Sequence, residues 1–282
     1  MIPAAFRYER PVTIHEAIEL LGQPEAKALA GGQSLLPLLR LRMAEPELLV
    51  DLQDIPELRG MRHDLDQVWV GAFVRHVELG ESAPWRVLRE AAEATGDRQV
   101  RRLGTIGGAT AHADPAGDLP AALLALHAVV EAVGPAGRRE IPIDGFFLGP
   151  LTTDLAPDEV LTGLRLPQPK SGTGSSYRKL RQKASGFALA GVGAMVRMEA
   201  GRCLVAGIGV TGVGLQPYAA EAAGRRLIGT PLGDADIEAA LEGLLEGVDV
   251  QEDAYASADY RAKMCRLCAT QALESARAEA LG

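Results

Sequence analysis

The sequence predicts an α+β protein built in two parts. Over the first 166 residues, short strand-like runs are mixed irregularly with short helix-like segments, which favours α+β over a regular parallel sheet. Residues 167–175 are rich in turn formers and are the best candidate for a boundary or flexible loop. Two apolar runs then predict a hairpin, at 189–198 and 202–210, and three helical segments close the chain at about 217–227, 234–245 and 257–280.

The first part begins with a well-marked helix. Thr13-Ile14-His15-Glu16 is a capping box, and the apolar residues that follow it lie on one helix face, with Gly22 beyond the end. Residues 26–29 predict a strand, and residues 35–39 a short buried helix with Ser34 at its N-cap. Further strands are expected at 48–51, 68–70, 129–133, 139–143 and 160–166, with a helix at 88–94 that Gly96 stops.

Length, composition and charge narrow the class of protein. A chain of 282 residues is long enough for two domains and a substantial core. The net charge of −8 and the aromatic content of 4% argue against a nucleic-acid-binding protein, which needs a basic surface and stacking platforms. No apolar run is long enough to span a membrane, and the N-terminus lacks a signal layout, so a cytoplasmic protein is expected.

The cysteines and histidines predict no metal site. Cys203, Cys265 and Cys268 are too few for an iron–sulfur cluster, which needs about four cysteines in suitable positions. Cys265 and Cys268 are best interpreted as two small residues on one face of a helix. The five histidines show no metal-ligand spacing, and no arrangement of catalytic side chains is legible, which favours chemistry carried by a cofactor.

Residues 207–212 match the dinucleotide-binding pattern G-x-G-x-x-G. In that motif the last glycine opens a helix directly, but here residues 213–217 intervene, and the preceding context predicts a hairpin rather than a βαβ unit. A nicotinamide-binding motif is therefore disfavoured.

The stretch on which the prediction of function depends is residues 101–120. Gly107 and Gly108 remove the Cβ atoms that would keep a ligand away from the backbone, and free N–H groups in such a loop suit a phosphate. Asp118 heads a helix-like segment, where it either caps the helix or accepts hydrogen bonds from sugar hydroxyls. The alternative is a tight surface loop with a capping aspartate.

A second loop of the same kind lies upstream, at Ala30-Gly31-Gly32-Gln33-Ser34. A strand, a Gly-Gly turn and a helix N-terminus together form a suitable phosphate site. Two such loops in one chain favour a dinucleotide cofactor, with its two phosphates held between them.

These residues resemble a known family. Residues 30–34, the run to Asp51, Thr105-Ile106-Gly107-Gly108 with Asp114 and Asp118, and the C-terminal residues 258–261 are similar to the FAD-binding subunits of molybdenum hydroxylases. Within the xanthine dehydrogenase family, the resemblance is greatest to the medium subunit of the aerobic carbon monoxide dehydrogenase type. It implies a two-lobed FAD-binding domain of the vanillyl-alcohol-oxidase (PCMH) type at 1–172, with lobes at about 1–56 and 57–172. A smaller α+β domain, an antiparallel sheet with helices, is implied at 173–282.

The resemblance also implies an FAD-carrying electron-transfer subunit. In that family a small subunit carries two [2Fe-2S] clusters and a large subunit the molybdopterin cofactor, in a dimer of heterotrimers, and the flavin passes electrons to an external acceptor. The substrate of the complex stays open among carbon monoxide, an aldehyde and an N-heterocycle. Two other functions stay open, a stand-alone flavin oxidase and an assembly protein that has lost flavin binding. Association of the complex with the inner face of the membrane also stays open.

The resemblance assigns cofactor-binding roles residue by residue, and no catalytic residue. The glycines of both loops are expected to offer N–H groups to the FAD pyrophosphate, and Asp118 to accept from an FAD hydroxyl. Leu161 is expected to pack on the ring system, or simply in the core, and Lys179 to approach the isoalloxazine, or to lie on a solvated basic face. The sequence departs from the family at Gln33, Ala109 and Gly186, which leaves the strength of binding open. The full set is Ala30, Gly31, Gly32, Gln33, Ser34, Thr105, Ile106, Gly107, Gly108, Ala109, Asp114, Asp118, Leu161 and Lys179.

Overall fold

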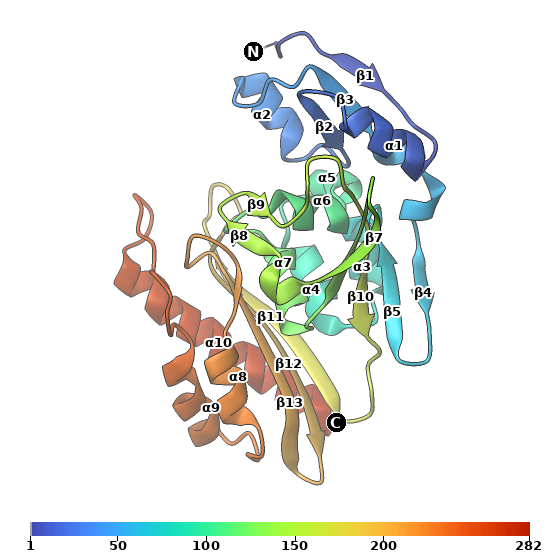
Figure 1. Cartoon of the computed structure of the whole chain (residues 1–282). Helices are drawn as coiled ribbons and strands as arrows, with labels where there is room; N and C mark the ends of the chain where they lie inside the picture. The colour runs from blue at the N-terminus through green and yellow to red at the C-terminus, as the bar shows by residue number, and fades with distance from the viewer. Residues whose placement is uncertain (1) are drawn as a thin grey trace.

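The computed structural model describes residues 2–282 and stacks three groups of elements, from the N-terminus at the top of Figure 1 to the C-terminus at the bottom. The N-terminal lobe is a three-stranded parallel sheet in the order β1-β3-β2, with two helices. Its own core gathers residues such as Ala17, Leu48 and Ile55. Its elements are β1 (Arg7–Glu9), α1 (Ile14–Leu21), β2 (Ala26–Leu29), α2 (Leu35–Leu41) and β3 (Leu48–Asp51).

The two helices of this lobe test the local predictions. Thr13 caps α1 by accepting a hydrogen bond from the Glu16 N–H, and the Glu16 carboxylate accepts in return from the Val12 N–H. The prediction that α2 is buried is wrong. Of its residues only Leu39 is buried, because one face of this short helix lies on the surface.

The middle of the chain forms a five-stranded antiparallel sheet in the order β4-β5-β10-β6-β7, with helices packed on one face. The strands predicted at 68–70, 129–133, 139–143 and 160–166 all lie in it. The strands are β4 (Met61–His63), β5 (Gln67–Gly71), β6 (Val129–Gly134), β7 (Gly137–Pro142), β10 (Val160–Pro167) and the small pair β8 (Phe147–Gly149) and β9 (Thr152–Thr153). The helices are α3 (His76–Ser82), α4 (Arg86–Ala94), α5 (Arg98–Leu103), α6 (Ile106–His112) and α7 (Asp118–Ala125).

The C-terminal part is an antiparallel sheet in the order β11-β12-β13-β14, covered by helices. The predicted hairpin is confirmed, but two details differ from expectation. Residues 177–181 of the basic run, for which a solvated face was one interpretation, belong to β11. Residues 218–219 form a strand where a helix was expected. Both segments pair with neighbouring strands. The elements are β11 (Thr173–Arg181), β12 (Ala188–Glu199), β13 (Arg202–Thr211), β14 (Tyr218–Ala219), α8 (Glu221–Leu227), α9 (Asp234–Ala240) and α10 (Ala258–Leu281).

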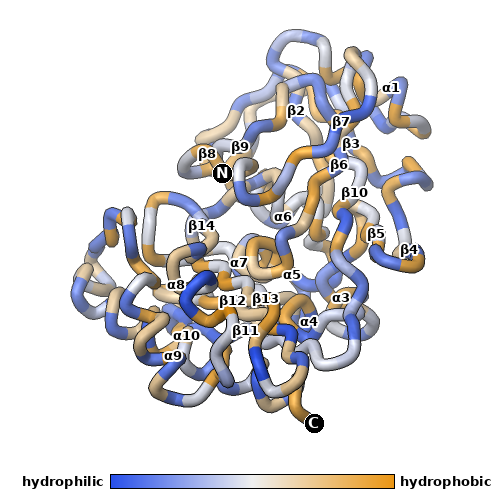
Figure 2. Tube along the Cα trace, turned by 60° about the horizontal axis from the view of Figure 1, so that its bottom comes forward, coloured by the Kyte–Doolittle hydropathy of each residue, from blue (hydrophilic) through white to orange (hydrophobic). Residues whose placement is uncertain are grey.

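Helix α7 joins the middle sheet to the C-terminal sheet, and glycines of β12 and β13 make room for it. A side chain at Gly209 would overlap the Ala121 carbonyl, and one at Gly207 the Ala125 carbonyl. In Figure 2 much of the trace where α7 meets β12 and β13 is coloured hydrophobic. The G-x-G-x-x-G pattern therefore reflects close packing of a helix on a sheet, which agrees with the rejection of a nicotinamide-binding motif.

No helix in residues 2–282 is long and apolar enough to cross a membrane. All three cysteines are buried as free thiols. In the same residues there is no group of three or more His, Cys, Asp or Glu side chains that could hold a metal ion.

Candidate cofactor site

The fold brings the two glycine loops together. A Cβ on Gly31 would overlap the Leu103 carbonyl and lie 2.9 Å from the Gly104 Cα. A Cβ on Gly108 would lie 3.4 Å from the Ala30 Cβ. The loop between β2 and α2 is thus packed against the segment that leads into α6, so the N-terminal lobe and the middle sheet meet at these glycines.

The first loop offers a row of unused donors. Within residues 2–282, none of the five backbone N–H groups from Gly31 to Leu35 has a protein acceptor. Gly32 has φ +71°, a left-handed conformation that turns the chain, and Gln33 closes the turn by donating to the Gly31 carbonyl at 3.0 Å. Ser34 occupies the N-cap of α2 but its side chain makes no capping bond. Successive free N–H groups form an anion-binding concavity, so this loop fits the pyrophosphate of FAD.

The second glycine pair uses its donors inside the protein. The Gly107 N–H donates to the Ala72 carbonyl at 2.9 Å, and the Gly108 N–H to the Thr105 hydroxyl at 3.1 Å. The neighbouring Ile106 and Ala109 N–H groups are also bonded within the protein. Neither N–H is therefore free in this structure, because both belong to the first turn of α6, and donation from Gly107 and Gly108 to the FAD pyrophosphate stays a prediction. Contact of these residues with FAD by other atoms stays a prediction.

Packing explains why this second pair must be glycine. A Cβ on Gly107 would lie 2.5 Å from the Ala72 Cβ, which is too close for any side chain. A Cβ on Gly108 would lie 2.9 Å from the Thr105 Oγ1. The pair therefore lets α6 approach the end of β5.

Asp114 shapes the turn that follows α6. Its side chain accepts from the Ala116 N–H at 2.8 Å, and its carbonyl accepts from the Gly117 N–H at 3.0 Å. The carboxylate also lies 3.9 Å from the His112 ring. Burial lowers the pKa of His112, and the Asp114 charge only partly opposes this. At this turn Asp114 orders the backbone between α6 and α7.

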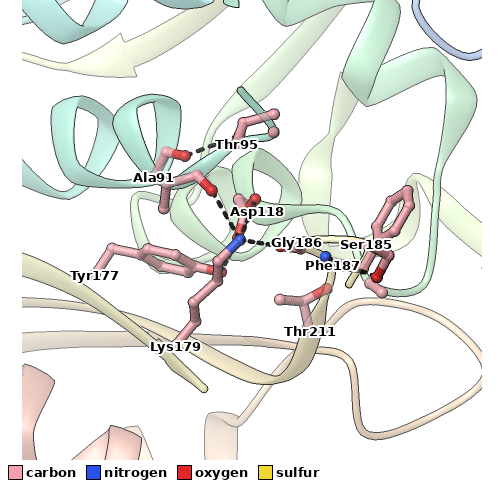
Figure 3. A network of polar contacts seen from close by, with 12 residues as sticks. Ala91, Thr95, Asp118, Tyr177, Lys179, Ser185, Gly186, Phe187 and Thr211 are labelled. Atoms are coloured by element: carbon pink, nitrogen blue, oxygen red, sulfur yellow. Dashed lines mark hydrogen bonds and ion pairs between the residues drawn. The ribbon is translucent and has the colours of Figure 1, made fainter. Parts of the chain in front are cut away.

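Asp118 is not a helix cap. It is the first residue of α7, it is 5% exposed, and its carboxylate lies 2.8 Å from the Lys179 Nζ and 2.6 Å from the Tyr177 hydroxyl. Figure 3 shows the three side chains pointing toward one another. Burial raises the pKa of Asp118 above its usual value, although the Lys179 ammonium and the Tyr177 hydroxyl oppose the shift. A buried ion pair across two domains was not expected from the sequence.

The Lys179 side chain in β11 is only 6% exposed, so the interpretation of this lysine as part of a solvated basic face is wrong, although Arg181 and Lys183 of the same run are exposed. Besides Asp118, its Nζ donates to the Ala94 and Gly186 carbonyls, each at 2.8 Å. All three of its protons therefore have protein acceptors. Gly186, with φ +80°, occupies a position where the family was expected to carry aspartate. Here its backbone carbonyl accepts a hydrogen bond from Lys179. Contact between Lys179 and the isoalloxazine stays a prediction.

Leu161 lies in β10, 7% exposed, within the core of the middle sheet. The strand register shifts between Leu161 and Gly163. Core burial, one of the two interpretations made for Leu161, is what the structure shows, and packing on the flavin ring stays a prediction.

Sequence reasoning missed two residues that organise this region. Tyr177 binds Asp118, and the Glu90 carboxylate accepts from the Ser176 hydroxyl and the Tyr177 N–H, each at 2.7 Å. The Arg178 guanidinium also lies 3.1 Å from Glu90. A period-2 pattern could not reveal these residues, because Gly174 to Tyr177 of β11 are buried consecutively instead of alternately.

Comparison with known proteins agrees with this fold and site. A family described as the FAD binding domain in molybdopterin dehydrogenase matches residues 4–169, and one described as the CO dehydrogenase flavoprotein C-terminal domain matches residues 175–276. The carbon monoxide dehydrogenase medium chain of Afipia carboxidovorans is 38% identical over 287 residues, covering 99% of each chain. The 6-hydroxypseudooxynicotine dehydrogenase complex subunit alpha of Paenarthrobacter nicotinovorans is 35% identical over 283 residues, covering 98% of this chain and 96% of the relative.

A solved structure agrees as well. Carbon monoxide dehydrogenase from Hydrogenophaga pseudoflava, which lacks the Mo-pyranopterin moiety of the molybdenum cofactor, matches with a TM-score of 0.94 at 40% identity and 99% coverage of each chain. Fold and site together define a flavoprotein of the molybdopterin dehydrogenase class, with FAD as its cofactor. The chain belongs to the family of carbon monoxide dehydrogenase medium chains, which are oxidoreductase subunits, and the predicted resemblance is confirmed.

Proposed function

We propose that this chain is the FAD-carrying electron-transfer subunit of a molybdenum hydroxylase complex. It receives electrons from the [2Fe-2S] clusters of a partner subunit and passes them to an external acceptor. The observation that carries the proposal is the row of free N–H groups from Gly31 to Leu35, which suits the FAD pyrophosphate. When bound, FAD accepts electrons singly and releases them in pairs.

The residues of this chain hold and enclose the cofactor. The Gly31–Leu35 loop supplies N–H donors, and the Thr105–Ala109 segment packs against the start of that loop, where Gly108 lies close to Ala30. Asp118 and Lys179 hold α7 against β11, so that the Asp114–Gly117 turn keeps one conformation. None of these residues reads the substrate, so carbon monoxide, an aldehyde and an N-heterocycle stay open for the complex, most closely a carbon monoxide dehydrogenase-like one.

We also propose where the iron–sulfur subunit docks. Leu148, Leu151, Phe187 and Leu215 are each more than half exposed. Their segments surround the turn after α6. Leu151 donates to the Ala113 carbonyl, the residue after Phe187 donates to the Ala116 carbonyl, and the residue after Leu215 donates to the carbonyl of Phe147. An exposed apolar patch beside the turn after α6, which the sequence predicts to contact FAD through Asp114, suits a partner subunit.

The proposal includes three further assignments, which concern the domain division, the assembly and the cellular location. The domain division falls at residues 172 and 173, where β10 has ended and β11 begins. The complex is a dimer of heterotrimers with a molybdopterin large subunit. It works in the cytoplasm, where it can associate with the inner face of the membrane.

Reconstitution tests the proposal. The isolated chain, purified with FAD, should be reduced by a strong chemical reductant but not by carbon monoxide, aldehydes or N-heterocycles. Adding the iron–sulfur and molybdopterin subunits should restore flavin reduction by the proper substrate. A chain that shows no flavin spectrum would be an assembly protein. A chain that alone oxidises a substrate as fast as the complex would be a flavin oxidase.

A further inference from the structure

Arg261 is a buried cation that the cofactor site does not include. It lies in the first turn of α10 and is 7% exposed. Its Nη1 donates to the Leu189 carbonyl at 2.9 Å and to the Gly212 carbonyl at 2.7 Å, and its Nη2 lies 2.6 Å from the Asp253 carboxylate. One guanidinium therefore ties the start of β12 to the residue that follows β13.

The same two strand ends also hold the turn between α6 and α7. The Gly212 N–H donates to the Pro115 carbonyl at 2.7 Å, and the Thr211 hydroxyl donates to the same carbonyl at 2.8 Å. The Ala188 N–H donates to the Ala116 carbonyl at 3.3 Å. Arg261 thus binds one side of the strand ends, and the Asp114–Gly117 turn binds the other.

Gly212 is the residue that bonds to both Arg261 and the turn between α6 and α7. It has φ +78°, and a Cβ there would lie 2.5 Å from the Ala188 carbonyl. Its carbonyl accepts from Arg261 while its N–H donates to Pro115. A shift of Gly212 therefore moves the turn directly.

The guanidinium is itself held in place by Asp253. The Asp253 carboxylate accepts from the Tyr255 and Ala256 N–H groups at 2.8 and 3.0 Å, which orients it toward Arg261. The two carbonyls bond to Nη1 and the carboxylate bonds to Nη2, so the acceptors are divided between two atoms of a planar fork, whereas lysine would present all its donors at one atom.

We propose that Arg261 is a positioning residue for the Asp114–Gly117 turn, which the sequence predicts to contact FAD through Asp114, and that it acts through Gly212 and the two strand ends. The turn leads directly into Asp118, whose ion pair with Lys179 fixes α7. The inference rests on the proposed function, because it assigns Arg261 a role in FAD binding. A positioning role of this kind predicts a change in affinity of about three- to thirtyfold.

The test uses the full chain freed of FAD, titrated with FAD while flavin fluorescence is recorded. Arg261→Met should raise the FAD dissociation constant about three- to thirtyfold, and it should speed amide hydrogen exchange at Ala116, Gly117 and Gly212. Arg261→Lys should recover only part of the affinity. The matched control is Arg277→Met, since Arg277 is on the same helix and donates to the Leu232 carbonyl, away from the turn. It should lower the melting temperature without changing the dissociation constant or the exchange of these amides.

Two results would overturn the inference while the proposed function stands. In one, wild-type chain binds FAD and Arg261→Met binds it equally well. In the other, both methionine variants weaken binding equally, which would make Arg261 merely structural. If Arg261→Met does not fold, Asp253→Asn replaces it, because Asp253 is half exposed. That variant should give a smaller rise in the dissociation constant and faster exchange at Gly212, and unchanged values would count against the inference. A wild-type chain that never binds FAD would instead refute the proposed function and the inference with it.

Discussion

In the loop from Gly31 to Leu35 five consecutive N–H groups have no acceptor among the described residues 2–282, whereas around Gly107 and Gly108 each N–H donates to a protein oxygen. The first loop connects a strand to a helix and lies outside both. The second pair lies in the first turn of α6, where the Thr105 side chain and the end of β5 take its donors. A glycine pair indicates that some group comes close to the backbone. Only the packing shows whether that group is a ligand or another part of the protein.

The comparison separates two kinds of region. The first loop is available to a ligand. The region from Thr105 to Asp118 is bonded internally, through Ala72, Tyr177 and Lys179. Changes in the first loop should therefore affect FAD affinity directly. Changes inside the second region should affect stability first, and FAD affinity only through the shape of the Asp114–Gly117 turn.

The largest effect is expected from Asp118→Ala. It leaves the Lys179 ammonium buried without a carboxylate, so the free energy of unfolding should fall by about 3–5 kcal/mol. Urea unfolding of the FAD-free chain measures this. The double variant Asp118→Ala with Lys179→Met is the control and should recover part of the loss. A loss below about 1 kcal/mol together with weaker FAD binding would show that Asp118 is a ligand rather than a structural residue.

Gly107→Ala should come next. The new Cβ meets Ala72, so overpacking should lower the free energy of unfolding by about 1–3 kcal/mol. Gly145→Ala is the control, since a Cβ there would meet no heavy atom within 4 Å from described residues other than its chain neighbours, and it should be close to neutral. If Gly107→Ala kept full stability and lost only FAD binding, the conclusion that the second glycine pair serves internal packing would be contradicted.

Ser34→Asp should show the opposite pattern. Ser34 makes no capping bond, so a carboxylate at this N-cap should leave stability unchanged or raise it by up to about 1 kcal/mol. The same carboxylate competes with a phosphate for the free N–H groups, and FAD affinity should fall about tenfold, or ~1.4 kcal/mol. Ser34→Asn caps without a charge and serves as the control. Equal FAD affinity in both variants would place the pyrophosphate elsewhere.

Lowering the pH should reduce the free energy of unfolding by protonating Glu90, which bonds to Ser176 and Tyr177 of β11. Burial raises the pKa of this carboxyl, but hydrogen bonds from the Tyr177 N–H and the Ser176 hydroxyl, with the Arg178 and Arg86 charges, bring it below its usual value. Because the folded pKa is lowered, the stabilisation is complete above the unfolded value of about 4.3 and is lost as the pH falls through the folded pKa. Unfolding at several pH values should show a smaller loss of stability on acidification in Glu90→Gln than in wild type, because carboxyls such as Glu159 and Asp253, whose pKa values are also lowered, still titrate in the variant. We expect the smallest effect here, since Glu90 keeps contact with solvent.

Local signals account for what the sequence predicted well. The capping box of α1 acts within one turn, and the hairpin of β12 and β13 follows from two apolar runs and a short turn. The same holds for the first glycine loop, whose strand, turn and helix are adjacent in the chain. These features depend on neighbours in sequence, so a sequence pattern is enough to find them.

Contacts between distant residues were decided by the tertiary structure. Ala72 takes the Gly107 donor, Lys179 pairs with Asp118 from another domain, and Arg261 reaches the ends of two strands. Within the basic run, Tyr177 and the Lys179 side chain are enclosed because Glu90 and the Ala94 carbonyl of α4 accept their hydrogen bonds, whereas Arg181 and Lys183 stay exposed. Residue type states which bonds a side chain can make, but only the folded chain decides which partner lies within reach.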